Sequence, residues 1–280
     1  MNVAGPQRRR ARVLVALLGA GLLLSAGAAR AQFFGGRDPV VFPSPSRTDR
    51  AFSLCRIMYT SSRREPSGAG WRTDYPFGEI NLMTRFSELT RTPVPFRGPR
   101  RPEHYVVRIT DDALFQCPFT MASDVGTMSL SPIEVERLRD YLLKGGFLWV
   151  DDFWGSAAWD QWEREIAQVL PPSEYPIEDV ALDDPIFNAQ FVVHEVPQIS
   201  NIAFWRATGG SSTSERGPDS AVPHFRAIRD TRGRILVVMS HNTDIADSWE
   251  REGEDAAYFF RFSPNGYAVG INVLLHALSH

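Results

Sequence analysis

The segment from Ser131 to Asp152 constrains the fold more than any other part of the sequence. It begins with a helical pattern that stops at the pair Gly145-Gly146, and it continues with Phe147 to Val150, which is apolar at every position. Ser131 is a favourable N-cap, and Glu134 three residues later completes a capping box. A strand without alternation is expected where helices cover both faces of a sheet. This segment therefore predicts a helix followed by a buried strand of a parallel sheet.

Further predicted strands and helices alternate along the chain, although their sequences do not form an internal repeat. The pattern predicts strands at residues 51–60, 104–110, 114–123 and 234–239, and helices starting near residue 78, at Ser156 (as N-cap) and near residue 267. Alternating strands and helices predict an α/β fold with a three-layer, wound and mainly parallel sheet. The pattern loosens between residues 173 and 232, which we interpret as an irregular insertion in one domain spanning residues 51–280.

The N-terminal residues have the pattern of a secretory signal peptide. Four arginines precede an apolar run from Val13 to Ala29, and Ala29-Arg30-Ala31 is a small-residue cleavage site, so we predict a signal peptide at residues 1–31. An uncleaved anchor is the alternative, but the run is short for a span and glycines break it. Residues 32–50 are rich in Pro, Gly and Ser and are predicted to be a linker. The prediction is an exported, periplasmic or extracytoplasmic protein without a stable membrane span after cleavage.

Composition excludes several classes of function. Acidic residues outnumber basic ones, 33 to 30, and no basic stripe suggests a nucleic acid partner. Neither a phosphate-binding loop nor a G-x-G-x-x-G motif occurs, and no G-x-S-x-G elbow is present. The two cysteines, Cys55 and Cys117, both fall in predicted strands. An oxidising compartment permits a disulfide between them, and two free buried thiols are the alternative.

Three polar clusters follow predicted strands or their loops. In open parallel sheets, ligands bind just beyond the carboxyl ends of the strands, so these clusters are expected to form one acidic pocket walled by tryptophans. The candidate ligand-binding residues are Asp74, Tyr75, Asp151, Asp152, Trp154, His241, Asn242, Asp244, Asp247, Trp249 and Glu250. For Asp74, and for Glu79 and Asn81 just after it, a structural role is favoured over a functional one.

The pocket admits more than one chemistry. Carboxylates accept hydrogen bonds from hydroxyl groups and indole rings pack on sugar faces, which suits a saccharide or another polar small molecule. Oxygen ligands also suit a hard divalent cation, although no cofactor is specifically predicted. Asp151 or Asp152 are the catalytic candidates, as an acid–base pair. Alternatively, one aspartate caps a helix and the other binds loop amides. His276 and His280 are four residues apart but lack a third ligand, so a structural role is favoured.

Several long motifs resemble a bacterial family known as domain of unknown function 4159. They are EVERLRDYLLKGGFLWVDDFWG, EVPQI, DTRGRILVVMSHNTDIADSWE and YAVGINVLLHALSH, and the resemblance runs from about Phe52 to His280. It implies a fold similar to the flavodoxin-like, class I glutamine amidotransferase-like sheet. The catalytic cysteine elbow of the amidotransferases has no counterpart here, so glutaminase activity is not expected. The family motifs coincide with the clusters at Asp151 to Gly155 and at Asn242 to Glu250.

These observations leave three hypotheses about function. The first is a non-catalytic binding or assembly module of the cell envelope, whose acidic pocket takes a polar ligand or a segment of an envelope protein. The second is a hydrolase of a glycan or related polar substrate that uses Asp151 or Asp152, with or without a metal ion. In the third, the clusters form a structural network and the function lies on another surface.

Overall fold

A computed structural model of the protein describes residues 39–44 and 52–279. The chain divides into two units, Met1–Val40 and Val41–His280, and every helix and strand named below belongs to the second. The predicted signal peptide and most of the predicted linker lie outside the described residues. None of the helices in the described part of the chain is long and apolar enough to cross a membrane.

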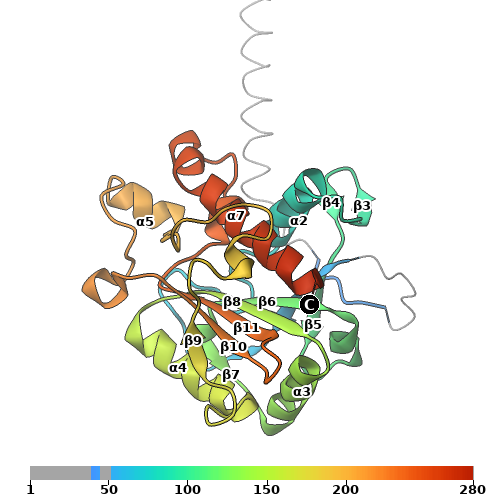
Figure 1. The fold of residues 1–280 in the computed structure, drawn as a ribbon. Coiled ribbons are helices and arrows are strands. Elements are labelled where there is room, and N and C mark those ends of the chain that lie inside the picture. Colours follow the sequence, from blue (N-terminus) through green and yellow to red (C-terminus); the bar gives the residue numbers. More distant parts are fainter. Residues whose placement is uncertain (1–38, 45–51, 280) are drawn as a thin grey trace, which may run out of the picture. The chain divides into compact units, whose positions relative to one another are not determined.

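A seven-stranded sheet forms the middle layer of the second unit, in the order β5-β1-β6-β8-β11-β10-β9 (Figure 1). Neighbouring strands from β5 to β11 run parallel, whereas β10 is antiparallel to both β11 and β9. The strands are β1 (Leu54–Met58), β5 (His104–Arg108), β6 (Phe119–Ser123), β8 (Phe147–Phe153), β9 (Ile177–Asp179), β10 (His224–Arg229) and β11 (Ile235–His241).

Helices cover both faces of this sheet (Figure 1). Helices α3 (Pro132–Leu143) and α4 (Gly155–Val169) pack on one face, where Leu138 and Trp162 are fully buried. Helices α2 (Phe77–Leu89) and α7 (Ala256–Ser279) pack on the other, through residues such as Phe86 and Leu274. The predicted three-layer, mainly parallel α/β fold is therefore confirmed.

Short elements complete the fold. The short helices are α5 (Ile202–Ala207), α6 (Asp247–Glu250), η1 (Asp112–Gln116), η2 (Val125–Thr127), η3 (Pro185–Phe187) and η4 (Gly217–Ser220). Two small antiparallel pairs join β2 (Thr60–Ser61) to β7 (Met128–Ser129) and β3 (Phe96–Gly98) to β4 (Arg101–Pro102).

The ends of two helices show how far local sequence determines local structure. The capping box of Ser131 and Glu134 is present at the start of α3, as predicted. Helix α4 instead begins at Gly155, so the prediction that Ser156 caps it is wrong. The backbone N–H of Gly155 donates to Asn242 Oδ1 at 2.8 Å, and that of Ser156 donates to Asp219 Oδ2 at 2.9 Å. Distant side chains therefore satisfy the free amides at the start of this helix.

Two predicted segments differ from the structure. Residues 114–123 are not one strand, because a short helix runs to Gln116 and β6 starts at Phe119, after Pro118. Proline has no N–H to donate to a sheet, which explains the late start. The region 173–232 is not irregular throughout, since β9 and β10 belong to the main sheet. In β10, buried Phe225 and Ala227 alternate with half-buried Arg226, as expected for a strand.

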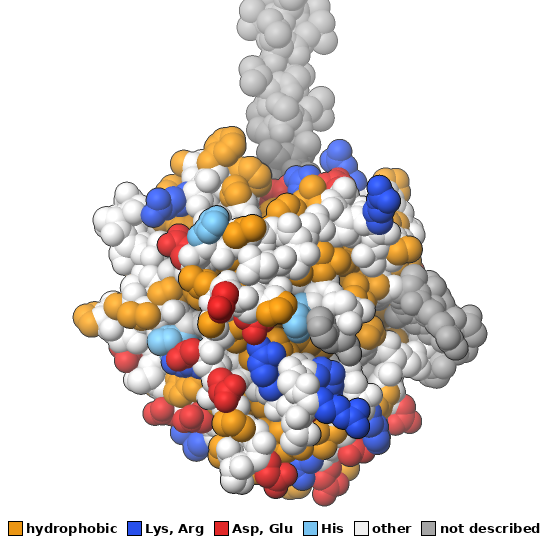
Figure 2. Space-filling view, viewed as in Figure 1, with side chains coloured by type: hydrophobic (Ala, Val, Ile, Leu, Met, Phe, Trp, Pro, Cys, Tyr) orange, Lys and Arg blue, Asp and Glu red, His pale blue; other side chains and the backbone are white. Residues whose placement is uncertain are grey.

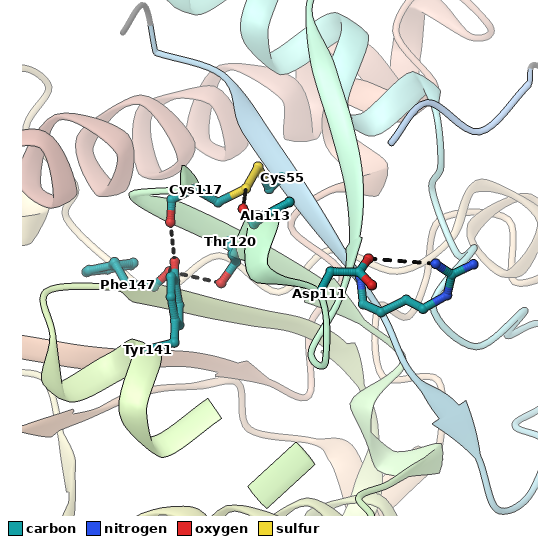
Figure 3. The surroundings of a disulfide bond; sticks show 8 residues. Cys55, Asp111, Ala113, Cys117, Thr120, Tyr141 and Phe147 are labelled. Carbon is teal, nitrogen blue, oxygen red and sulfur yellow. Dashed lines mark hydrogen bonds and ion pairs between the residues drawn. A yellow bond between two sulfur atoms is a disulfide. The ribbon is translucent and has the colours of Figure 1, made fainter. Parts of the chain in front are cut away.

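A disulfide joins Cys55, in β1, to Cys117, just before β6 (Figure 3). The two Cα atoms are 6.0 Å apart, and the bond closes a loop with a sequence separation of 62 residues. The Tyr141 hydroxyl donates to the carbonyl oxygens of Cys117 at 2.8 Å and Phe147 at 3.1 Å, which holds the turn against the sheet (Figure 3). The alternative of two free thiols is therefore wrong, as is the placement of Cys117 in a strand.

Candidate binding site

The candidate site lies where the carboxyl ends of four neighbouring strands, β1, β6, β8 and β11, meet one edge of the sheet. The loops that follow these strands enclose a cavity of about 220 Å³. The chain passes from β1 to β5 on one side and then to β6 on the other, so the strand order reverses beside β1. Such a reversal opens a crevice beyond the strand ends, which is the usual ligand site of wound α/β sheets.

A bulge at the end of β8 separates the roles of the two adjacent aspartates. Val150 pairs with Met239 and Phe153 pairs with His241, so β8 holds one residue more than β11 between these pairs. Asp152 has a φ of 54°, in the left-handed region that aspartate tolerates better than most residues. Bulges of this kind redirect side chains beside functional sites. Asp152 lines the cavity as a result, whereas Asp151 does not.

Asp151 has a structural role. Its side chain is fully buried, Oδ1 accepts a hydrogen bond from Ser240 Oγ at 2.6 Å, and Oδ2 accepts one from the backbone N–H of Ala246 at 2.9 Å. Burial raises the pKa of Asp151 to about 6, and these hydrogen bonds limit the rise. The carboxylate therefore ties the end of β8 to β11 and to the loop before α6.

Five carboxylates cluster at the floor of the cavity, in two overlapping groups. One oxygen each of Asp74, Asp152 and Asp244 lie within 4.8 Å of one another. The same holds for Asp74, Asp247 and Glu250, so Asp74 belongs to both groups. Asp74 precedes α2, Asp152 is the next-to-last residue of β8, and the other three follow β11. Three separate parts of the chain thus bring like charges together, which is costly without a proton or a cation.

Burial and mutual repulsion raise the pKa values of the four aspartates in this cluster. The pKa of Asp74 is raised to about 8, chiefly by burial and also by the charges of Glu250 and Asp151, against the opposing effect of Arg56. Burial also holds the pKa values of Asp152, Asp244 and Asp247 well above the usual range of aspartate, with neighbouring carboxylates adding to the effect. Carboxyl groups with such shifts mark candidate functional sites.

Arginines line the cavity in smaller number than carboxylates. Eight carboxylate residues face three arginines: Glu65, Asp74, Asp124, Asp152, Glu215, Asp244, Asp247 and Glu250 against Arg72, Arg216 and Arg251. Over the face seen in Figure 2, by contrast, acidic and basic side chains are interspersed. The lining of the cavity thus has more acidic than basic side chains.

Two of the three arginines are already paired. Arg216 lies 3.3 Å from Glu65 and 3.5 Å from Glu215, and so links the loop before α2 to the loop after α5. Arg251 lies 2.6 Å from Glu250. Arg72 is exposed, and its guanidinium lies 4.5 Å from the centroid of the Trp71 ring.

The aromatic residues that line the cavity are Tyr75, Phe153 and Trp154. The Trp154 indole N–H donates to Asp152 Oδ1 at 2.9 Å, which orients that carboxylate. Trp249, expected as a second wall, is instead fully buried in the core, where its ring centroid lies 6.0 Å from that of Trp149.

His241 and Asn242 also lie outside the cavity lining and support it from behind. The His241 ring packs between Phe153 and Trp159 at 5.0 and 5.1 Å, and burial lowers its pKa to about 4. Asn242 has a φ of 61°, accepts from Gly155 and donates to the Val222 carbonyl at 2.9 Å. Both residues shape the loops that carry Trp154 and Asp244.

Glu79 and Asn81 make structural contacts, whereas Asp74 lines the cavity. Glu79 forms a fully buried ion pair with Arg56, and Asn81 donates to the Trp249 carbonyl at 2.7 Å. Asp74 belongs to both carboxylate groups and accepts a hydrogen bond from Ser123 Oγ at 2.9 Å. Asn272 accepts from two loop amides near Gln190, and His280, the partner considered for His276, lies outside the described residues.

Several residues that line the cavity were not among the candidates predicted from the sequence. Asp124 directly follows β6, so its position at the end of a strand could have identified it as a candidate. It accepts a hydrogen bond from the Gly70 N–H at 2.8 Å, which holds the preceding loop over the cavity. Glu215 and Arg216 come from a polar loop without periodicity, and Arg251 and Glu65 likewise carry no pattern.

Fold and site together define a three-layer α/β protein with an acidic cavity at the carboxyl edge of its sheet. The chain belongs to the family described as Domain of unknown function (DUF4159), whose profile matches residues 54–278. Every residue that lines the cavity falls within this match. A search of curated proteins finds no match.

Proposed function

We propose that this protein is an exported, non-catalytic binding module whose cavity holds a positively charged group of a polar ligand or of an envelope partner protein. The observation that carries the proposal is the ratio of eight carboxylates to three arginines around one cavity of about 220 Å³. Two of those arginines are already paired with carboxylates. A positively charged guest relieves the repulsion that the fold by itself leaves in place.

Export to the periplasm or another extracytoplasmic compartment is part of this proposal. Disulfides form and persist mainly in oxidising compartments, and the bond between Cys55 and Cys117 supports such a location. The leader-like pattern of residues 1–31 points the same way.

A bacterial origin and a likeness to the class I glutamine amidotransferase fold also remain proposals. Amidotransferase chemistry needs a free thiolate, and this chain has two cysteines in total, both in the disulfide. A binding role is therefore better supported than a glutaminase role.

The walls of the cavity favour an amine-bearing saccharide among possible ligands. Tyr75, which is half-buried, offers an aromatic face that can pack on the apolar side of a sugar ring. The carboxylates of the cavity accept hydrogen bonds from hydroxyl and ammonium groups. The volume suits one sugar residue rather than a long chain, since pockets for drug-sized ligands begin at about 300 Å³.

Calorimetric titration with a glucosamine oligosaccharide and with its N-acetylated counterpart tests this function. We expect the charged oligosaccharide to bind and the acetylated one to bind at least about tenfold more weakly, a loss of about 1.4 kcal/mol. Asp244→Asn should weaken binding similarly. The matched control is Asp183→Asn, an exposed aspartate outside the cavity. Equal affinity for the two oligosaccharides, or equal effects of the two variants, would contradict the proposal.

A hydrolase remains the second candidate, supported by one observation. Asp74, with its pKa raised to about 8, stays protonated near neutral pH, as a general acid requires. Asp151 fits this role less well, because both its oxygens accept hydrogen bonds inside the scaffold. Release of reducing sugar ends from a glycan, lost in Asp74→Asn, would favour the hydrolase over the binding module.

A further inference from the structure

We propose that Ser123 is a positioning residue, whose hydroxyl group holds the Asp74 carboxylate in the cavity for a positively charged guest. The buried ion pair of Arg56 and Glu79 holds Ser123 in turn. This inference rests on the proposed function and deepens it, because it assigns the control of one carboxylate in the cavity to three residues outside the cavity lining. The alternative is that the same contacts only stabilise the fold.

Four side chains form a continuous series of contacts that ends at the cavity. Arg56 Nε in β1 donates to Glu79 Oε1 in α2 at 2.5 Å, and Arg56 Nη1 donates to Ser123 Oγ, at the end of β6, at 2.6 Å. Ser123 Oγ then donates to Asp74 Oδ2 at 2.9 Å. All four residues are buried, and Asp74, at 7%, is the most exposed of them. Asp74 is also the one member of the series that lines the cavity.

Arg56 fixes the direction of the hydrogen bond between Ser123 and Asp74. A guanidinium group donates hydrogen bonds and accepts none, so Ser123 Oγ must be the acceptor in its contact with Arg56. A hydroxyl group has a single proton to donate, and Asp74 Oδ2 receives it. Asp74 Oδ2 is therefore an acceptor, and a proton that Asp74 binds belongs on Oδ1.

The residues behind Ser123 are held firmly in place. The side chains of Arg56 and Glu79 are both fully buried, and Arg56 Nε and Nη2 both contact Glu79 Oε1, which leaves Nη1 for Ser123. Because a buried charge without its partner is costly, this ion pair stays closed in the folded protein. The Tyr59 hydroxyl donates to the Ser123 carbonyl oxygen at 2.8 Å, so the backbone of Ser123 is held as well as its side chain.

These contacts favour the ionised form of Asp74, which a positively charged guest requires. Burial raises the pKa of Asp74, whereas the charge of Arg56 and the hydrogen bond from Ser123 lower it. Arg251 also attracts the ionised form. The acidic groups that oppose ionisation are Asp151, Asp152, Asp244, Asp247 and Glu250. Since a hydroxyl group donates a stronger hydrogen bond to a carboxylate than to a neutral carboxyl group, loss of Ser123 Oγ should make Asp74 harder to ionise.

The test is an NMR titration of the side-chain carboxyl carbons, in which the Asp74 signal is the one that Asp74→Asn removes. In Ser123→Ala, the pKa of Asp74 should rise from about 8 by about one pH unit. Ser123→Thr keeps a hydroxyl group and should restore the original pKa. The matched control is Thr120→Val, which removes another fully buried hydroxyl group of β6, bonded to the Phe147 carbonyl, and should leave the pKa of Asp74 unchanged.

Calorimetric titration with the glucosamine oligosaccharide at neutral pH connects this pKa to the guest. A pKa higher by one pH unit makes ionised Asp74 about ten times rarer, so Ser123→Ala should weaken binding about tenfold. Ser123→Thr and Thr120→Val should each change the Kd less than threefold. Thermal unfolding shows that each variant is folded. If Ser123→Ala does not fold, Ser123→Cys replaces it, and its weaker S–H donor should raise the pKa of Asp74 by a smaller amount.

The outcomes separate this inference from the proposed function. If Ser123→Ala leaves the pKa of Asp74 unchanged, or if Thr120→Val raises it equally, Ser123 has a structural role only and the inference is refuted. The inference also fails if the pKa rises while the oligosaccharide binds Ser123→Ala as tightly as the unmutated protein, and the binding module then stands without it. If the pKa rises but the oligosaccharide does not bind the unmutated protein, the control of Asp74 by Ser123 holds and the proposed function fails.

Discussion

Removal of the disulfide should cost this protein a large part of its stability. The bond between Cys55 and Cys117 closes a loop with a sequence separation of 62 residues, which restricts the unfolded chain far more than the folded one. In the chain-entropy model, a loop of this length corresponds to about 14 cal/mol/K, or about 4 kcal/mol at 25 °C. For a domain of this size, that loss lowers the Tm by roughly 8 to 16 °C.

The assay is urea unfolding of the double variant Cys55→Ala/Cys117→Ala. Alanine is the better replacement, because both cysteines are buried, at 0% and 2% exposed, and serine would bury an unpaired hydroxyl. Unmutated protein unfolded under strong reductant serves as the control and should agree with the variant within about 1 kcal/mol. A loss below about 1 kcal/mol in both experiments would refute the argument, since it would mean that the loop is equally restricted without the bond.

Three further predictions concern the core and the cavity. Glu79→Gln leaves the fully buried Arg56 without its partner and should cost about 3–5 kcal/mol in urea unfolding; a cost below 1 would contradict this. Gly126→Ala places a methyl group 2.4 Å from a side-chain carbon of α4 and should cost about 1–3 kcal/mol, and an unchanged Tm would disprove the clash. With a chelator present, the free energy of unfolding should fall as the pH rises from about 4 towards 8, because Asp74 binds its proton more tightly in the folded chain than in the unfolded chain. Asp74→Asn should make the free energy of unfolding less dependent on pH. An equal pH dependence in both proteins would exclude Asp74 as its source.

Local patterns were sufficient for most of the architecture. The capping box at Ser131 and the continuously apolar segment from Phe147 correctly placed α3 and β8. The antiparallel strands β9 and β10 were missed, because three to six residues in a long polar region carry little periodicity. The strand predicted across Cys117 failed at Pro118, where the missing N–H ends the pairing.

The site was predicted in its position and only partly in its membership. Asp152, Asp244 and Glu250 were expected at the strand ends and do line one cavity. Asp151 and Trp249 were equally plausible from their sequence neighbours, but the first ties the scaffold together and the second packs in the core.

The sequence by itself determined that strands and helices alternate and that acidic turns follow the strands, because hydrophobic period and capping act over a few residues. Only the tertiary structure decided which carboxylates meet. One extra residue in β8, seen in its register with β11, turns Asp152 towards the cavity and Asp151 away from it. The disulfide and the contact between Arg216 and Glu65 likewise join residues far apart in the chain. Such pairings depend on distances that arise only when the sheet has formed, and no local pattern encodes them.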